Sequence, residues 1–565
     1  MTDTLIASLS ALAGIFLQNC NLLEWLGLVV LLGLGRYLGH DPFQAVGKLW
    51  AGKLWYWRYL SVAAVAPVAC LTLFIRTGSA PAPAVPDEWS HLFLADTLLS
   101  GRFANPPVPQ PAAFEAIHIL PSPTRSSMYL FGPALWLATG KALFGNGLWG
   151  IALAGAFLGI ALLWGLDSLF EPQWAWLGTM LFLLKAVCGG IWGMYWIQSY
   201  WGGIPGALAG VLVTSAIWRL ADLRTNPWIC GMILGVGASL LMNTRPFEGI
   251  ALCAGLLPSA FFLVPRQRLA LAAVPVLMIV GGTFALMRTH FEAVTGDPGK
   301  LPYVRNQELY GWPMTLPWMP VGNPPPRHED MKAYWDWERR EHETPLLQSA
   351  ARKFGMNWQH YIGAFLAIPF LLALRRWREV PKLAVLLPLA AVVAAVVIEQ
   401  TGYPHYLSPA SGVIAALVAA GCRMWSGGRA MLLVVGLLIM FGIRTATPAA
   451  VTPQAAAGSL CCRYDMGSQR QAVVNRLNAE PGRHLVFVPN TIHVGSSDFY
   501  PWVYNEPDLA QAKIVFARDL GSANDKALWK EHFRDRKVWL AAPGIPLKPR
   551  PVESENDSQP ENRRP

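Results

Sequence analysis

Two adjacent carboxylates, Asp87 and Glu88, lie a short distance beyond the end of an apolar run. Pro86 precedes them, and two histidines, His91 and His118, follow in the same segment. A positioned carboxylate can take the proton of a hydroxyl group and so turn it into a nucleophile. The pair also suits a purely structural role, because acidic side chains favour the first turn of any helix. These residues alone leave both interpretations open.

Cationic side chains that would complement the carboxylates lie at the ends of other apolar runs. Arg245 lies in the sequence NTRPFEG, His405 lies in YPHY, and Lys185 is near the end of its own run. Ionisable residues at membrane depth are costly and usually functional, and arginine binds phosphate with two parallel hydrogen bonds. Simpler roles also exist: Lys185 can extend to the interface, His405 can be a packing residue, and Arg245 can pair with Glu248.

More polar side chains lie in the segments that join these runs. The loop 288–357 mixes aromatic, acidic and proline residues, which predicts either helices that cover a lipid-facing cavity or an aromatic belt at the membrane interface. Taken with the histidines and Glu248 above, the cavity candidates are His91, His118, Arg125, Tyr200, Glu248, Tyr303, Arg305 and Tyr403.

The composition indicates that a membrane must surround most of the chain. Of the 565 residues, 53% are apolar and only 14% are charged. Soluble globular proteins carry about 25% charged residues, so this chain has too few to cover a water-exposed surface. Its 25 Trp and 24 Phe also exclude a disordered chain, which would be poor in aromatic residues.

The net charge of +10 comes largely from short basic clusters between apolar runs. This arrangement is typical of membrane topology and not of a nucleic-acid-binding face, so no nucleic-acid partner is expected. The chain contains no CxxC pair, no Walker A loop and no GxGxxG sequence, which leaves no indication of a redox pair, ATP or a dinucleotide.

A helix needs about 20 mostly apolar residues to cross a bilayer. Eleven runs meet this need, and the stretch 5–35 adds one tilted span, a hairpin or an interfacial pair, so we expect about 11–13 transmembrane helices. The eleven predicted spans are 59–76, 147–166, 174–191, 203–220, 228–244, 249–264, 269–287, 358–374, 383–399, 404–422 and 430–444.

Lys and Arg in short loops set the orientation, because cytoplasmic loops are enriched in them. When eleven spans alternate, the basic clusters fall on one side, which we assign to the cytoplasm, and the acidic loop 167–173 is uninformative. The outer loops 77–146 and 288–357 and the tail from residue 445 then lie outside. The basic clusters are Arg36–Arg58, Arg219 and Arg224, Arg266 and Arg268, Arg375–Lys382, and Arg423 and Arg429.

The tail has a different character from the rest of the chain. Short β-rich runs at 484–488, 513–517 and 537–541, with a polar helical stretch at 522–533, predict a small α/β domain. The expected domains are membrane-associated N-terminal helices with a basic loop (1–58), a transmembrane domain (59–444), the α/β domain (445–545) and a disordered tail (546–565).

An acidic pair that opens the first large outer loop of a polytopic chain resembles the GT-C glycosyltransferases. The similarity is to the branch of protein O-mannosyltransferases, the aminoarabinose transferase of lipid A and Rgt-type lipopolysaccharide glycosyltransferases. It covers roughly residues 59–450 and includes Ala95-Asp96-Thr97 and Gly101-Arg102 after the acidic pair. The sequences RPFEG and YPHY also look like features of a bacterial branch of this family. The fold implied is a GT-C-like helical membrane protein with a periplasmic α/β domain.

The resemblance implies a sugar donor carried on a polyprenyl phosphate and a glycan, lipid or protein acceptor, in the bacterial inner membrane. It implies Asp87 as the general base, and we expect Glu88 to assist it by orienting the loop or binding acceptor. Arg245, then His405 and Lys185, are the expected ligands of the donor phosphate. The chain lacks a WWDYG-type sequence, so no essential metal is expected. The alternatives are a transporter or flippase, and a non-catalytic membrane scaffold for the C-terminal domain.

Overall fold

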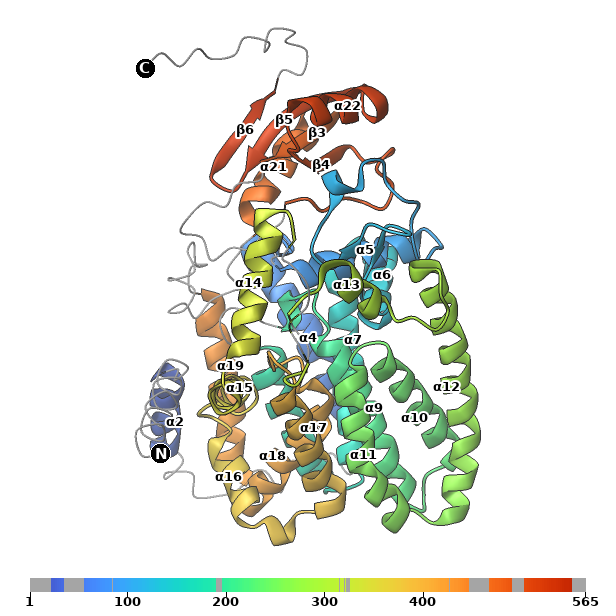
Figure 1. Cartoon of the computed structure of the whole chain (residues 1–565). Helices are drawn as coiled ribbons and strands as arrows, with labels where there is room; N and C mark the ends of the chain where they lie inside the picture. The colour runs from blue at the N-terminus through green and yellow to red at the C-terminus, as the bar shows by residue number, and fades with distance from the viewer. Residues whose placement is uncertain are drawn as a thin grey trace.

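The computed structural model describes residues 22–34, 55–83, 85–189, 196–313, 316–319, 321, 326–425, 427–446, 467–489 and 502–550. A helical bundle forms one end of the molecule, and a small mixed sheet lies at the other end (Figure 1). Below, the two ends are called the bundle end and the sheet end. The prediction of a polytopic helical membrane protein with a small C-terminal α/β domain is confirmed.

Within the described residues, five helices are long and apolar enough to span a membrane. Four shorter apolar helical stretches accompany them, at Glu24–Leu34, Pro227–Met242, Lys382–Ile398 and Gly428–Ile443. The five long helices are α4 (Trp55–Thr77), α7 (Gly147–Leu166), α9 (Gly203–Ala221), α11 (Pro246–Leu263) and α12 (Arg266–Thr295).

The other bundle elements fall near the predicted spans, with one exception. The predicted span 358–374 is wrong, because α15 ends at Tyr361 and α16 begins only at Ala367. Of the stretch 5–35, the described part is a single helix, α2, and residues 5–21 lie outside the described residues. The remaining elements are α2 (Leu22–Leu34), α8 (Pro172–Phe182), η2 (Leu183–Val187), α10 (Pro227–Met242), α16 (Ala367–Arg375), η4 (Trp377–Glu379), η5 (Lys382–Leu386), α17 (Leu387–Ile398), η6 (Ser408–Ala410), α18 (Ser411–Trp425) and α19 (Gly427–Ala446).

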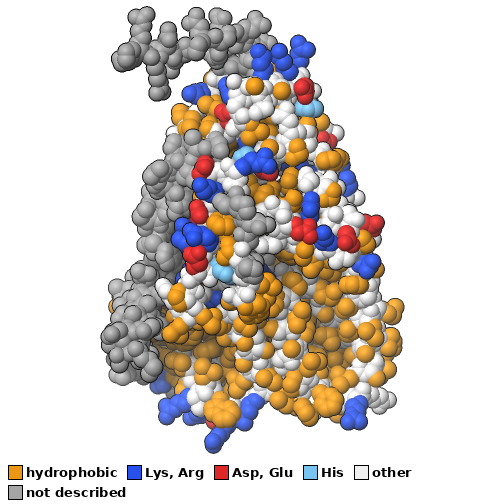
Figure 2. All heavy atoms as spheres, in the orientation of Figure 1, with side chains coloured by type: hydrophobic (Ala, Val, Ile, Leu, Met, Phe, Trp, Pro, Cys, Tyr) orange, Lys and Arg blue, Asp and Glu red, His pale blue; other side chains and the backbone are white. Residues whose placement is uncertain are grey.

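Apolar side chains cover the visible face of the bundle end, and Lys and Arg gather along its lower edge (Figure 2). On α12, the side chains of Leu277 and Met278 are each 72% exposed. Exposure of such apolar side chains to water is unfavourable, whereas contact with lipid tails carries no such cost. A broad apolar surface of this kind, bordered by cations, is the surface expected of a membrane-spanning bundle.

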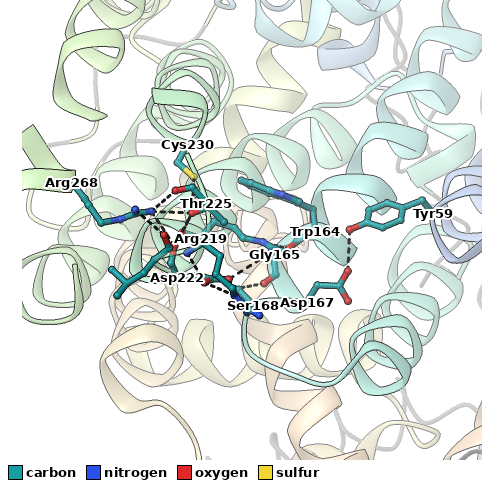
Figure 3. A network of polar contacts seen from close by, with 12 residues as sticks. Tyr59, Trp164, Gly165, Asp167, Ser168, Arg219, Asp222, Thr225, Cys230 and Arg268 are labelled. Carbon is teal, nitrogen blue, oxygen red and sulfur yellow. Dashed lines mark hydrogen bonds and ion pairs between the residues drawn. The ribbon is translucent and has the colours of Figure 1, made fainter. Parts of the chain in front are cut away.

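The predicted basic loops meet at the bundle end. Arg268 at the start of α12 donates hydrogen bonds to the carbonyl oxygens of Asp222 and Thr225 in the loop that follows α9 (Figure 3). Arg58 of α4 pairs with Asp167 at 2.8 Å. Asp167 belongs to the acidic loop 167–173, and Glu171 of the same loop pairs with Arg423 at 3.0 Å. The acidic loop therefore lies on the basic side and neutralises part of its charge.

Small residues let the bundle helices pack closely. At the crossing of α6 (Gly132–Phe144) and α7, a Cβ added to Gly150 would lie 1.7 Å from the carbonyl oxygen of Trp136. Only glycine fits at such a close backbone approach. Asn146 begins α7 by accepting a hydrogen bond from the Leu148 N–H at 2.9 Å. The α6–α7 pair thereby joins the outer segment to the bundle.

Short elements form a layer between the bundle and the sheet (Figure 1). The strands β1 and β2 pair antiparallel, with Ile119 opposite Ser127. These elements are α5 (Pro86–Leu99), η1 (Pro111–Phe114), β1 (Ile119–Leu120), β2 (Ser126–Ser127), η3 (Trp196–Gln198), α13 (Pro302–Tyr310) and α14 (Glu329–Glu343). The helix α15 (Leu346–Tyr361) lies at the level of the bundle and contacts α17 (Figure 1).

The C-terminal domain is a four-stranded sheet in the order β4-β3-β5-β6. The central strand β3 runs parallel to both neighbours, so Leu485 lies beside Val515 and Val538. The predicted strands and helix are all present, but residues 545–549, mostly expected in the disordered tail, form β6 against β5. The elements are α21 (Ser468–Ala479), β3 (Arg483–Val488), β4 (Ile514–Arg518), α22 (Ser522–His532), β5 (Arg536–Ala542) and β6 (Ile545–Pro549).

Candidate active site

A cavity of about 810 Å³ lies in the layer between the bundle and the sheet. Its walls come from the first turn of α5, the start of α11, the helices α13 and α14, and the segment 399–406. Eight of the predicted site residues line it: Asp87, His91, His118, Arg245, Glu248, Tyr303, Tyr403 and His405. Residues separated by more than 300 positions in the sequence therefore share one chamber.

Asp87 is in the first turn of α5, directly after Pro86. Tyr129 donates a hydrogen bond from its hydroxyl group to one carboxylate oxygen, and His118 Nδ1 lies 3.9 Å from the other. Burial raises the pKa of Asp87, but the His118 imidazole, the Tyr129 hydroxyl group and His91 outweigh it, so the pKa lies below its usual value. The carboxylate is therefore ionised at neutral pH and able to accept a proton.

His118 and two tyrosines extend this contact away from Asp87. The Tyr129 hydroxyl group lies 3.1 Å from His118 Nδ1, and the Tyr334 hydroxyl group lies 3.4 Å from His118 Nε2. Burial lowers the pKa of His118, and burial with the charge of Arg245 lowers the pKa of His91 to about 3. Both imidazoles therefore hold a proton less readily than a free histidine does.

Glu88 points away from the cavity. Its carboxylate is fully buried and accepts hydrogen bonds from the Tyr200 N–H at 2.9 Å and from the Ser199 hydroxyl group at 3.2 Å. These bonds join the first turn of α5 to the segment that precedes α9. These contacts suit one of the two roles expected for Glu88, orienting the loop, which stays a prediction.

Arg245 is the residue directly before α11, and its guanidinium carbon lies 4.2 Å from the centre of the Tyr406 ring. Among the described residues that line the cavity, it is the one Lys or Arg. Its Nε is buried and has no hydrogen-bond partner among the described residues. A buried arginine with an unused donor is well suited to an anion such as a phosphate.

His405 lies beside Arg245 at the edge of an aromatic cluster. Its ring stacks on Trp201 with ring centres 4.6 Å apart. Burial, together with the charge of Arg245, holds the pKa of His405 well below its usual range. The neutral ring can donate one hydrogen bond to a phosphate but adds no positive charge.

Besides Glu88, four of the predicted site residues lie outside the cavity. Lys185 in η2 forms a buried ion pair with Glu24 at 3.0 Å, so its charge is already neutralised. Arg125 donates to carbonyl oxygens of residues 505–507, Arg305 approaches Ser122, and the Tyr200 hydroxyl group donates to Pro81. The prediction that Lys185 binds the donor phosphate is therefore not supported.

Several cavity residues were absent from the predicted set. Tyr406 belongs to the sequence YPHY, and Tyr129 ends the sequence PSPTRSSMY, so both stood beside residues that drew attention. Glu399 ends an apolar run, which marks an ionisable residue at membrane depth. Trp201, Tyr334 and Glu338 are further cavity residues that were absent from the predicted set.

Among the described residues, no group of three or more His, Cys, Asp or Glu side chains has the geometry of a metal site. Asp87 contacts a tyrosine and a histidine, and Arg245 supplies a positive charge in the same cavity. The donor set therefore suits an anionic ligand.

No protein-family model and no curated protein sequence matches this chain. Solved structures do match it. ArnT from Cupriavidus metallidurans, bound to undecaprenyl phosphate, is 14% identical with a TM-score of 0.49, over 87% of this chain and 93% of that one. ArnT and the oligosaccharyltransferase in the next sentence both belong to the GT-C superfamily. The archaeal oligosaccharyltransferase AglB from Archaeoglobus fulgidus, in complex with an inhibitory peptide and a dolichol-phosphate, is 10% identical with a TM-score of 0.47, over 86% and 70%.

These matches are to the superfamily that the sequence resembles. At such identities and TM-scores they describe a similarity of overall architecture. No residue of this chain takes its role from them, and the function proposed below is argued from the cavity.

Proposed function

We propose that this protein is a membrane glycosyltransferase that moves a sugar from a polyprenyl-phosphate carrier to an acceptor hydroxyl group. The observation that carries the proposal is that Asp87 and Arg245 line the same cavity. One offers an ionised carboxylate and the other a cation with an unused donor. A volume of about 810 Å³ lies in the range of pockets that enclose small substrates.

In the proposed reaction, the acceptor oxygen attacks the anomeric carbon of the sugar. Asp87 takes the hydroxyl proton as the new carbon–oxygen bond forms. The bond between the anomeric carbon and the phosphate oxygen breaks, and its electron pair leaves with the carrier phosphate. Attack from the opposite face inverts the anomeric centre. Arg245 stabilises the charge that develops on the phosphate, so no strong general acid is required.

We also propose where the reaction takes place and which molecules take part in it. The protein lies in the bacterial inner membrane, with the sheet end in the periplasm and the basic loops in the cytoplasm. The acceptor is a glycan, a lipid or a protein. No divalent metal is essential, because Arg245 supplies the positive charge beside the phosphate. Addition of EDTA should leave the transfer rate unchanged, and a loss restored by Mg²⁺ or Mn²⁺ would contradict this part.

The experiment that tests the function uses the purified full-length chain and a panel of synthetic polyprenyl-phosphate sugars. Release of polyprenyl phosphate in a single turnover, with water or an added alcohol as acceptor, reports the chemical step. The wild-type chain should release it and Asp87→Asn should not. Equal release by both proteins, or no release with any sugar of the panel, would count against a glycosyltransferase.

A further inference from the structure

The C-terminal domain touches the helix that carries Asp87. The ring of Tyr504 stacks on Trp89, two residues after Asp87, with ring centres 5.3 Å apart and planes within 6°. The guanidinium carbon of Arg470 lies 4.3 Å from the centre of the same Trp89 ring. Arg470 also donates to the Tyr504 carbonyl oxygen at 2.7 Å, so these groups form one rigid unit. A group of the domain thus covers the first turn of α5.

Tyr504 also contacts the segment that carries His118. Its hydroxyl group donates a hydrogen bond to the Ile117 carbonyl oxygen at 2.7 Å, and the Tyr504 side chain is buried. Ile117 directly precedes His118, the histidine beside Asp87 and Tyr129. One side chain of the C-terminal domain therefore contacts both segments of the Asp87–Tyr129–His118 network.

The backbone at His118 explains why such a contact matters. His118 has a φ of +65°, a left-handed conformation that non-glycine residues adopt rarely. Residues in such conformations persist where the surroundings fix them by several contacts. Here the Ser90 hydroxyl group and the Met128 N–H both donate to the His118 carbonyl oxygen, at 2.8 and 3.1 Å. The Tyr504 bond to Ile117 fixes the peptide group on the other side.

Docking of the domain does not depend on the Tyr504 hydroxyl group. Arg518 of β4 forms an ion pair with Asp330 of α14 at 2.6 Å and donates to the Glu115 carbonyl oxygen at 2.8 Å. Arg125 donates to the carbonyl oxygens of Glu506 and Asn505. With these anchors in place, the hydroxyl group of Tyr504 serves the geometry of the backbone at residues 117 and 118.

We infer that Tyr504 is a positioning residue for the transfer reaction: its hydroxyl group holds the Ile117–His118 backbone so that the imidazole meets Tyr129 beside Asp87. The inference rests on the proposed function, because it assigns Tyr504 a part in that chemistry. It gives the C-terminal domain a direct role in the rate of the reaction, in addition to its place at the sheet end of the molecule.

The test is a double-mutant cycle between Tyr504→Phe and His118→Asn in the full-length chain. Phe keeps the stacking on Trp89 and removes only the hydrogen bond. Asn removes the imidazole, and it adopts left-handed backbone more readily than most residues. Tyr504→Phe should lower the single-turnover rate about three- to tenfold, the worth of one buried hydrogen bond, with donor affinity unchanged. In the His118→Asn background the same change should cost less than about twofold, because effects that act through one residue do not add.

Trp539→Phe is the matched control. It also removes one buried hydrogen bond of the domain, from Trp539 Nε1 to His484 Nδ1 at 3.1 Å, but within the sheet. We expect a full transfer rate and a lower melting temperature. Equal losses by Tyr504→Phe in both backgrounds would overturn the inference, as would a comparable rate loss in Trp539→Phe. A full rate in Tyr504→Phe while Asp87→Asn is inactive would overturn it and leave the proposed function standing. Activity in Asp87→Asn would instead remove the function.

Discussion

Ionisable side chains gather at both ends of the helical bundle, but their surroundings differ. At the bundle end, Arg268 donates to the carbonyl oxygens of Leu220, Asp222 and Thr225 at 2.8 to 3.0 Å (Figure 3). At the sheet end, Arg245 lines a large cavity with a buried Nε that has no partner among the described residues. The first arginine is satisfied by its own protein, and the second is left with capacity for a ligand.

The comparison shows that charge at a membrane face does not by itself indicate a site. Sequence patterns find both clusters, because both are sets of charged residues beside apolar runs. What separates them is whether protein groups satisfy the charge, since a buried polar group without a partner is costly unless function requires it. Four sets of substitutions, each with a counterpart at the bundle end, test this comparison.

The largest effect should come from the two aspartates. Asp87→Asn removes the base but keeps the size of the side chain, so turnover should fall by about two to four orders of magnitude. Asp167→Asn disrupts contacts to Arg58 and to the Tyr59 hydroxyl group, 2.8 and 3.0 Å away. It should lower the melting temperature and leave turnover of the folded protein unchanged. Single-turnover rates and thermal unfolding in detergent measure both, and the reverse pattern would refute the assignment.

The second largest effect should come from substitution of the two arginines, Arg245 and Arg268. Arg245→Ala should weaken donor binding about tenfold to a hundredfold, the worth of a charge-assisted hydrogen bond to phosphate. Arg245→Lys should recover only part of this, because lysine lacks the planar fork of arginine. Arg268→Ala should destabilise the fold without changing donor affinity. Binding of a fluorescent polyprenyl phosphate to each purified variant makes the comparison, and wild-type affinity in Arg245→Ala would remove it from the site.

Two tyrosines that donate to aspartates test the ionisation of the base. Asp87 has a lowered pKa, so it stays charged as the pH falls and turnover should decline only at acidic pH, below the usual pKa of an aspartate. Tyr129→Phe removes a hydrogen bond that favours the charged form, so the acidic limb of the turnover profile should move to higher pH. Tyr59→Phe at the bundle end should leave the profile unchanged. A profile that does not move in Tyr129→Phe would show that Asp87 does not control it.

The smallest effect should come from cysteine reporters of orientation. Ser522 in the C-terminal domain and Glu379 after α16 are both exposed, so replacing either should not alter turnover. An impermeant thiol reagent applied outside intact cells should label Ser522→Cys and not Glu379→Cys, and permeabilisation should expose the second. Labelling of Glu379→Cys in intact cells would show that the bundle end faces the outside, which would contradict the proposed orientation.

Local features of this molecule follow well from the sequence. Apolar runs and β-rich runs depend on neighbouring residues, and so most of the bundle and three of the four strands of the C-terminal sheet were predicted close to their observed bounds. Asp87, Arg245 and His405 were placed at one face because each lies at or shortly beyond the boundary of an apolar run, and all three line the cavity. The failed span at 358–374 also has a local cause: apolar composition continues across the break between α15 and α16.

Partners that are distant in the sequence could not be predicted in this way. Tyr129 is 42 residues from Asp87, and Tyr334 is 216 residues from His118. Lys185 looked suited to a phosphate because its partner Glu24, 161 residues away, bears no visible relation to it in the sequence. Without the fold, a cation paired by its own protein cannot be distinguished from one that awaits a ligand.

The hydroxyl group of Tyr129 fixes the tautomer of a neighbouring ring. It carries one proton and donates it to Asp87, so toward His118 it can only accept. When neutral, the imidazole must therefore carry its hydrogen on Nδ1, the nitrogen that faces Tyr129. The Nδ1–H of His118 and the hydroxyl group of Tyr129 then donate in one direction, toward Asp87, and each bond polarises the next. Loss of the His118 imidazole should consequently alter the proton affinity of the Asp87 carboxylate.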